Sequence, residues 1–250
     1  MNKKIIYDFG SNNGDDIPYY LLKSDLVIAV EANPALCEQI KNRFKEQISN
    51  GNLIVENCIL NTAKSSDQVA FYIHKTDHKL SQFLKPTNID QFEEMLLPSK
   101  NVIEIIRKFG KPYYIKIDLE HYDQIILHEL FINNIMPPYI SSESHSIEVF
   151  SLLLVLGKYN SFKLVDGNSV SNRYKNYNIT TNNGNIEYSF PHHSTGPFGN
   201  DISGPWMTPN HFFRVLAFAG LGWKDIHASN IEEPDPNYLP QPQFRMTINV

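Results

Sequence analysis

The chain has 250 residues, of which 42% are hydrophobic and 20% charged, and its formal net charge is −5. This length suits one large α/β domain, and the composition excludes a chain that is disordered as a whole. The acidic balance and the scattered lysines and arginines argue against a nucleic-acid partner, because nucleic-acid-binding proteins present a basic stripe to the phosphates.

Short apolar runs alternate with helical segments along residues 4–166. The pattern predicts strands at 4–9, 25–31, 52–57, 113–118, 138–143 and 162–166, with an extra edge strand or hairpin at 68–73. It predicts helices at 14–23, 34–48, 89–97, 102–109, 122–133 and 147–156. Strand, helix, strand, helix, strand near the N-terminus indicates βαβ units, so we expect a mostly parallel, doubly wound, Rossmann-like sheet.

Residues 167–208 differ from the rest, since they are rich in Asn, Ser, Gly, Pro and Tyr and show little apolar periodicity. Long loops in compact domains are usually functional or disordered, so we expect a substrate-binding lid inserted into a single domain spanning 1–250. Gly196, Gly199 and Gly204 are candidate hinges of this lid.

After this insertion the pattern predicts a helix at 210–219, a strand at 223–227 and an extended, proline-containing tail at 229–250. An apolar run at 244–250 ends the tail, and the pattern leaves open which of the two late runs completes the sheet.

Two cysteines, Cys37 and Cys58, lie outside any metal-binding or redox spacing, so we expect buried free thiols. The first residues lead directly into a strand pattern, and no apolar stretch has the length of a signal peptide or a membrane span. We therefore expect a cytoplasmic protein without a membrane span.

A turn rich in glycine and asparagine follows the first strand, Asp8-Phe9-Gly10-Ser11-Asn12-Asn13-Gly14. Open α/β sheets bind ligands at this edge, and the two glycines let the backbone turn tightly and approach a ligand. Glu31 ends the second strand about twenty residues later, at the position that binds ribose hydroxyls. The turn therefore predicts a nucleotide-like cofactor.

The ligand of this turn has two candidates. A nicotinamide dinucleotide requires GxGxxG, because its pyrophosphate sits against a helix N-terminus. Here the glycines are spaced GxxxG, and Asp15 and Asp16 at the predicted helix start would repel a pyrophosphate. S-adenosylmethionine carries no phosphate, so it is favoured. A purely structural turn is the remaining alternative, and Glu31 argues against it.

Three segments together resemble the FkbM family of class I methyltransferases, over roughly residues 4–166. They are Asp8 to Gly14, Val30-Glu31-Ala32-Asn33-Pro34 and Lys116-Ile117-Asp118-Leu119-Glu120-His121-Tyr122-Asp123. Ala32 replaces a proline of the family pattern, His121 a glycine and Asp123 a glutamate. A serine usually found after the hairpin of that family is matched by Ser81, and residues 194–206 resemble a stretch found in some members only.

The resemblance implies a class I methyltransferase fold with a mostly parallel, seven-stranded sheet. It implies O-methylation of a sugar, a nucleotide-activated sugar or a glycan precursor, with S-adenosylmethionine as methyl donor. The residues we expect to contact this cofactor are Asp8, Gly10, Ser11, Asn12, Gly14, Glu31, Ala32, Asn57 and Asp118. Alternatives are another small-molecule nucleophile, such as an amine or a carboxylate, or an accessory protein that binds the cofactor without turnover. A homo-oligomer stays open.

Methyl transfer from a sulfonium depends largely on in-line positioning, and a hydroxyl acceptor must also lose its proton to a base or with help from a metal. Candidate groups follow two predicted strands, and the catalytic candidates are Asp118, Glu120, His121 and His145. Carboxylates with an imidazole could bind Mg²⁺ or Mn²⁺, and Asp118 and Glu143 are the candidate ligands. The alternatives are a metal-free base, His145 or Glu120, and acids with a purely structural role.

The acceptor is expected to contact a further set of residues: Ser81, Lys116, Glu143, His192 and His193. Trp206 either stacks on a sugar face or anchors packing, and both roles are typical of tryptophan.

Overall fold

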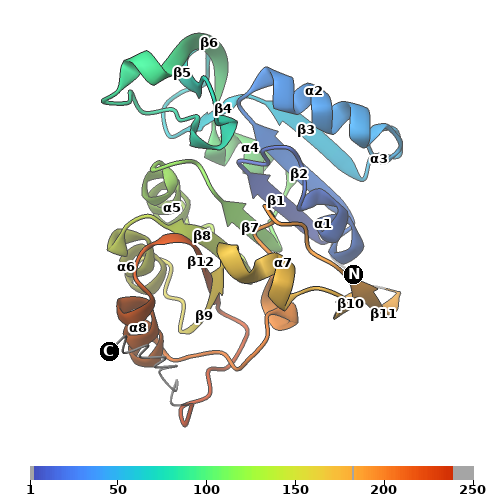
Figure 1. The fold of residues 1–250 in the computed structure, drawn as a ribbon, viewed down its shortest axis with the longest axis vertical. Coiled ribbons are helices and arrows are strands. Elements are labelled where there is room, and N and C mark those ends of the chain that lie inside the picture. Colours follow the sequence, from blue (N-terminus) through green and yellow to red (C-terminus); the bar gives the residue numbers. More distant parts are fainter. Residues whose placement is uncertain (1–2, 182, 239–250) are drawn as a thin grey trace, which may run out of the picture.

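The structure is a computed structural model that describes residues 3–181 and 183–238. Its centre is a seven-stranded sheet in the order β3-β2-β1-β7-β8-β12-β9 (Figure 1). The strands are β1 (Ile5–Phe9), β2 (Leu26–Glu31), β3 (Leu53–Asn57), β7 (Tyr114–Ile117), β8 (Tyr139–Ser144), β9 (Ser161–Asp166) and β12 (Gly222–Ser229). Neighbouring strands are parallel except that β12 runs antiparallel to both β8 and β9.

This strand order confirms the predicted fold class, a mostly parallel, seven-stranded, doubly wound, Rossmann-like sheet. The order reverses between β1 and β7, and ligands of such sheets bind beside the carboxyl ends at this switch point. The open question of the late strands is also settled. The run predicted at 223–227 becomes β12 and enters the sheet, whereas the run at 244–250 lies outside the described residues.

Helices cover the sheet on both faces because successive strand residues point to opposite sides. Ile5, Tyr7 and Phe9 pack with α4 (Val102–Phe109), α5 (Asp123–Ile132), α6 (Ile147–Val155) and α8 (Pro209–Ala219). Ile6, between them in sequence, packs on the other face with α1 (Ile17–Lys23) and α2 (Pro34–Arg43). The predicted helix at 34–48 is interrupted at Phe44, after which α3 (Lys45–Ser49) follows.

A second, three-stranded sheet lies beside the main one, next to β2 and β3 in Figure 1. It contains β4 (Ile59–Asn61), β5 (Ser66–His74) and β6 (Phe92–Asn101), in the order β4-β6-β5. The prediction of a helix at 89–97 is wrong, because a short 3₁₀ turn, η2 (Ile89–Gln91), leads into β6. Pairing of Phe92 to Leu97 with β5 outweighs the helix propensity of Glu, Met and Leu in this segment.

Residues 167–208 supply core side chains to the sheet face that α1 and α2 leave uncovered. They form η3 (Gly167–Ser169), α7 (Val170–Arg173), the hairpin β10 (Tyr177–Thr181) and β11 (Gly184–Tyr188), and η4 (Gly199–Asp201). Phe198 stacks on Tyr114 with ring centroids 4.1 Å apart, and the buried Trp206 stacks on Tyr139 at 6.2 Å. Of the two roles considered for Trp206, the structure therefore shows the packing anchor.

Both cysteines are buried and free, as predicted. Across the described ranges, none of the helices combines the length and the apolar character needed to cross a bilayer.

Candidate functional site

A cavity of about 590 Å³ lies beside the carboxyl ends of β1, β2, β7 and β8. One part of its wall comes from the ends of these strands and the turns that follow them: Gly10, Asn12, Asn13, Glu31, Ala32, Asp118, Leu119, Glu120, Glu143 and His145. The opposite part comes largely from the small sheet and its loop: Ile59, Leu60, Phe71, Phe83 and residues 76–81, which include η1 (His78–Leu80). A cavity therefore lies at the sheet edge where the sequence predicts a bound ligand.

The glycine turn is bound tightly to both neighbouring strands. The backbone N–H groups of Gly10 and Ser11 donate to Val30 O at 2.9 and 3.1 Å. Gly10 has φ +80°, and a Cβ there would lie 1.9 Å from the carbonyl oxygen of Asp118. Only glycine fits this position, because any side chain would collide with the backbone that follows β7.

Glu31 is held at the cavity wall by backbone donors. Its carboxylate accepts from Asn12 N and Asn33 N, each at 2.8 Å. Burial raises the pKa of Glu31 to about 7 despite these two donors, which favour the ionised form. The side-chain amide of Asn57 donates to the carbonyl oxygens of Glu31 and Ala32 at 3.0 and 2.8 Å. Asn57 therefore supports the end of β2 from behind the wall.

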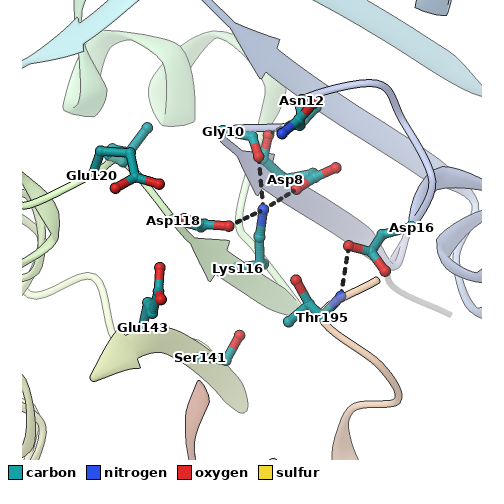
Figure 2. Close-up of polar contacts among 12 residues, drawn as sticks. Asp8, Gly10, Asn12, Asp16, Lys116, Asp118, Glu120, Ser141, Glu143 and Thr195 are labelled. Carbon is teal, nitrogen blue, oxygen red and sulfur yellow. Dashed lines mark hydrogen bonds and ion pairs between the residues drawn. The ribbon is translucent and has the colours of Figure 1, made fainter. Parts of the chain in front are cut away.

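Lys116 lies behind the glycine turn and does not line the cavity. It is only 3% exposed. Its Nζ donates to Gly10 O at 2.7 Å and lies 3.4 Å from Asp8 Oδ1 and 3.3 Å from Asp118 Oδ2 (Figure 2). Burial opposes its charge, but the carboxylates of Asp118 and Asp8 raise its pKa well above the ordinary value. Lys116, which the sequence predicts to contact the substrate, therefore links β1 to β7 behind the cavity wall.

The turn after β7 is strained at two successive positions. Glu120 has φ +44° and His121 φ +69°, a region that residues with a Cβ rarely occupy. Such strain costs about 1–3 kcal/mol per residue and clusters at functional sites. The result is that Glu120 lines the cavity while His121 is exposed, its ring 4.5 Å from the His145 ring. A glycine at position 121 would adopt this φ without strain.

Glu120, Glu143 and His145 meet at one end of the cavity. Glu143 Oε2 lies 2.9 Å and Glu120 Oε2 3.9 Å from His145 Nε2. Burial raises the pKa of Glu143 to about 9, and the neighbouring carboxyls of Asp118 and Asp123 add to this shift. Burial, Asp118 and Glu143 raise the pKa of Glu120 to about 8. Once ionised, these two carboxylates are stronger bases than ordinary carboxylates and can accept a proton or bind a cation.

The predicted acceptor contacts are divided between the cavity and its surroundings. Ser81 lines the cavity, and its Oγ accepts from His74 N at 3.1 Å. His193 also lines it, whereas His192 does not. Of the described residues of 167–208, only His193 reaches the cavity wall, and the role of this segment as a lid stays a prediction.

Trp223, at the start of β12, is a cavity residue that sequence reasoning missed. Its ring lies 6.1 and 6.2 Å from those of His192 and His193. No local signal marks Trp223, because it reaches the cavity only through the insertion of β12 beside β8.

The two acids at the start of α1 point away from the cavity. Asp15 pairs with Arg43 at 2.9 Å, and Asp16 accepts from Ser194 Oγ and from Thr195 N at 3.2 Å. The helix begins at Ile17, three residues after the predicted start. The buried Asp16 immediately precedes its N-terminus, the place where dinucleotides put their pyrophosphate. Of the two acids, Asp16 is therefore the one that would repel the pyrophosphate of a dinucleotide.

No protein-family model matches this chain, and no curated protein matches its sequence. Solved structures match its fold. Methyltransferase FkbM from Methylobacillus flagellatus KT is 14% identical with a TM-score of 0.45, over 66% of this chain and 40% of that chain. Precorrin-6y C5,15-methyltransferase from Geobacter metallireducens GS-15 is 9% identical with a TM-score of 0.40, over 66% and 67% of the two chains.

Spermidine synthase from Thermotoga maritima is 11% identical with a TM-score of 0.39, over 96% of this chain and 57% of that chain. This chain covers 40% of the length of methyltransferase FkbM from Methylobacillus flagellatus KT, which is well under half. These likenesses concern the fold alone.

Proposed function

We propose that this chain is an S-adenosylmethionine-dependent methyltransferase that acts on a hydroxyl of a sugar, a nucleotide-activated sugar or a glycan precursor. One observation carries the proposal. The carboxylate of Glu31 is fixed by two backbone N–H groups at the wall of a cavity, beside a turn that Gly10 brings close to the ligand space. This arrangement suits a ribose whose two hydroxyls donate to one carboxylate.

The residues around Glu31 fit the rest of the cofactor. Leu36, Ile59 and Leu60 give the wall an apolar part that suits an adenine ring. Asp118 and the backbone of Gly10 line the neighbouring part, where the ammonium of the cofactor's methionine moiety would find acceptors. When bound, the cofactor supplies the methyl group from its sulfonium. Lys116 and Asp8 act as positioning residues, because they hold the glycine turn against β7.

The acceptor would lie on the side of Glu120, Glu143 and His145. On methyl transfer to a hydroxyl, the O–H bond breaks and its proton passes to a base or to water. The new O–C bond forms as the C–S bond breaks, and the electron pair of that bond stays on sulfur. The raised pKa of Glu120, about 8, makes its ionised form a stronger base than an ordinary carboxylate.

An amine acceptor is the second candidate, because the acceptor side of the cavity carries Asp118, Glu120 and Glu143. Carboxylates attract a cationic amine, although they equally attract a metal ion.

Titration calorimetry with S-adenosylmethionine and S-adenosylhomocysteine tests the cofactor. We expect saturable binding at pH 8, and Glu31→Gln should weaken it about 10- to 100-fold, the effect of a lost charge-assisted hydrogen bond. Glu38→Gln removes an exposed carboxylate of the following helix and should change nothing. Because the ionised form of Glu31 binds the hydroxyls and its pKa is about 7, wild-type affinity should fall as the pH drops below 7. Absence of heat with both ligands at every pH would refute the proposal.

A screen with a methyl-labelled donor tests the acceptor. Nucleotide-activated sugars, free sugars and small amines are incubated with the chain, and the products are identified by mass spectrometry. We expect a methylated hydroxyl in a sugar product. Turnover of amines alone would replace the first candidate by the second.

A further inference from the structure

Three side chains at the proposed acceptor end of the cavity bring potential metal-ligand atoms close together. We propose that Glu120, Glu143 and His145 bind one divalent cation of the Mg²⁺ or Mn²⁺ type. One atom from each, a carboxylate oxygen or an imidazole nitrogen, lies within 4.8 Å of the other two. A cation bound at about 2.0–2.4 Å from each ligand atom can bridge such a triangle. This set differs from the ligands predicted from sequence, since Asp118 is paired with Lys116 at 3.3 Å.

The carboxyl group of Glu143, whose Oε2 lies 2.9 Å from His145 Nε2, is buried among other acids. It is 7% exposed, and the acids of Asp118, Asp123 and Asp225 surround it. Lys116 is the buried ammonium of this region, and Asp8 and Asp118 already share its charge. Several carboxyl groups crowded at one end of a cavity form a region whose negative charge, on ionisation, a bound cation would neutralise.

His145 presents a buried ring nitrogen to the carboxyl groups of Glu143 and Glu120. Its Nε2 is buried and makes no hydrogen bond within the described residues, although Glu143 Oε2 lies 2.9 Å away. The neutral form of this nitrogen has a lone pair, and imidazole is a common metal ligand. A cation between His145 and Glu143 would take the imidazole lone pair and a carboxylate oxygen as ligands.

The strained turn places the third ligand. With both Glu120 and His121 in left-handed conformations, the Glu120 side chain points into the space that Glu143 also faces (Figure 2). The surrounding structure holds these two residues in strained conformations. In these conformations the Glu120 and Glu143 carboxyl groups lie close together.

Two carboxylates and one imidazole favour a hard or borderline cation, and they neutralise its two charges. The remaining coordination positions face the cavity, where an acceptor hydroxyl could bind and have its pKa lowered. That use of the cation rests on the proposed function, whereas its binding does not.

Mn²⁺ serves as the probe, with the full chain freed of metal by a chelator and no methyl donor present. Calorimetry and electron paramagnetic resonance should show one saturable site, for which Mg²⁺ competes. Glu120→Gln and Glu143→Gln should each weaken binding at least about 10-fold. Glu94→Gln changes an exposed carboxylate of β6 and should leave binding unchanged. Circular dichroism confirms that each variant is folded.

The spin-echo spectrum of bound Mn²⁺ should show coupling to an imidazole nitrogen, and His145→Ala should remove it. Absence of a saturable site in the wild type would overturn the proposal, as would unchanged affinity in both glutamine variants or a nitrogen signal that survives His145→Ala. A chain that binds S-adenosylmethionine but no Mn²⁺ refutes the cation site alone. A chain that binds Mn²⁺ but no methyl donor refutes the methyltransferase proposal alone.

Discussion

Two carboxylates of nearly equal burial have very different surroundings in this molecule. Asp201, in the segment 167–208, is 6% exposed and accepts from Tyr19 Oη at 2.8 Å, Lys23 Nζ at 2.7 Å and Thr180 N at 3.2 Å. Glu143, at the cavity, has an equally buried carboxylate beside other acids and one imidazole. A buried charge with a full set of donors stabilises a fold, whereas one without them is a candidate for function.

The same contrast separates the two regions as a whole. Asp16 and Asp201 attach residues 167–208 to α1 through bonds to Ser194, Thr195 and Tyr19. The cavity instead carries Glu120 and Glu143 beside one imidazole, and a strained turn. We therefore expect substitutions in the first region to change stability and substitutions in the second to change activity.

The largest expected effect is on turnover. Asp118 lines the cavity beside Lys116, so Asp118→Ala should lower kcat about 100- to 1,000-fold through lost positioning and electrostatic stabilisation. Single-turnover kinetics measure the loss, and Asp90→Ala, which changes an exposed aspartate of η2, is the matched control. Full turnover by Asp118→Ala would show that the proposed centre is misplaced.

A smaller effect, on stability, is expected in the other region. Asp201→Ala leaves the Lys23 ammonium and the Tyr19 hydroxyl without their partner, so the free energy of unfolding should fall by about 3 kcal/mol. Urea denaturation measures this change, and the affinity for S-adenosylmethionine should stay constant. Glu143→Gln should show the opposite behaviour, with unchanged or higher stability. If Asp201→Ala weakened cofactor binding more than folding, the division between the regions would fail.

The smallest expected effect is a pH dependence of stability that comes from the buried His227. His227 is buried next to Lys163, and its Nε2 makes no hydrogen bond within the described part of the chain. Burial and Lys163 lower its pKa to about 3. Below about pH 6.5 the imidazole of His227 becomes protonated in the unfolded chain but stays neutral in the folded chain. The free energy of unfolding therefore decreases as the pH falls.

Between pH 6.5 and pH 5 this loss should reach about 2 kcal/mol, and His227→Gln should lack it. Urea denaturation at both pH values compares the two proteins. Equal pH dependence would mean that His227 has a partner at low pH.

Local patterns predicted the strands well where one apolar run becomes one buried strand, as at β1, β2 and β7. They failed at 89–97, because the pairing that makes β6 a strand is with β5 about twenty residues earlier in the chain. They also missed that Phe198 is a core residue and left two roles open for Trp206, since aromatic residues in an irregular segment show no periodicity that a short window can detect.

The sequence by itself determined the elements of the main sheet, the glycine turn and the acid that ends β2. These features follow from short-range sterics and burial, as when φ +80° at Gly10 requires glycine. Only the tertiary structure decided which charged groups meet. Asp16 and Ser194 are 178 residues apart, and Glu120 approaches His145 because β7 and β8 are neighbours. Such contacts depend on strand order and on the path of long connections, which no local pattern encodes.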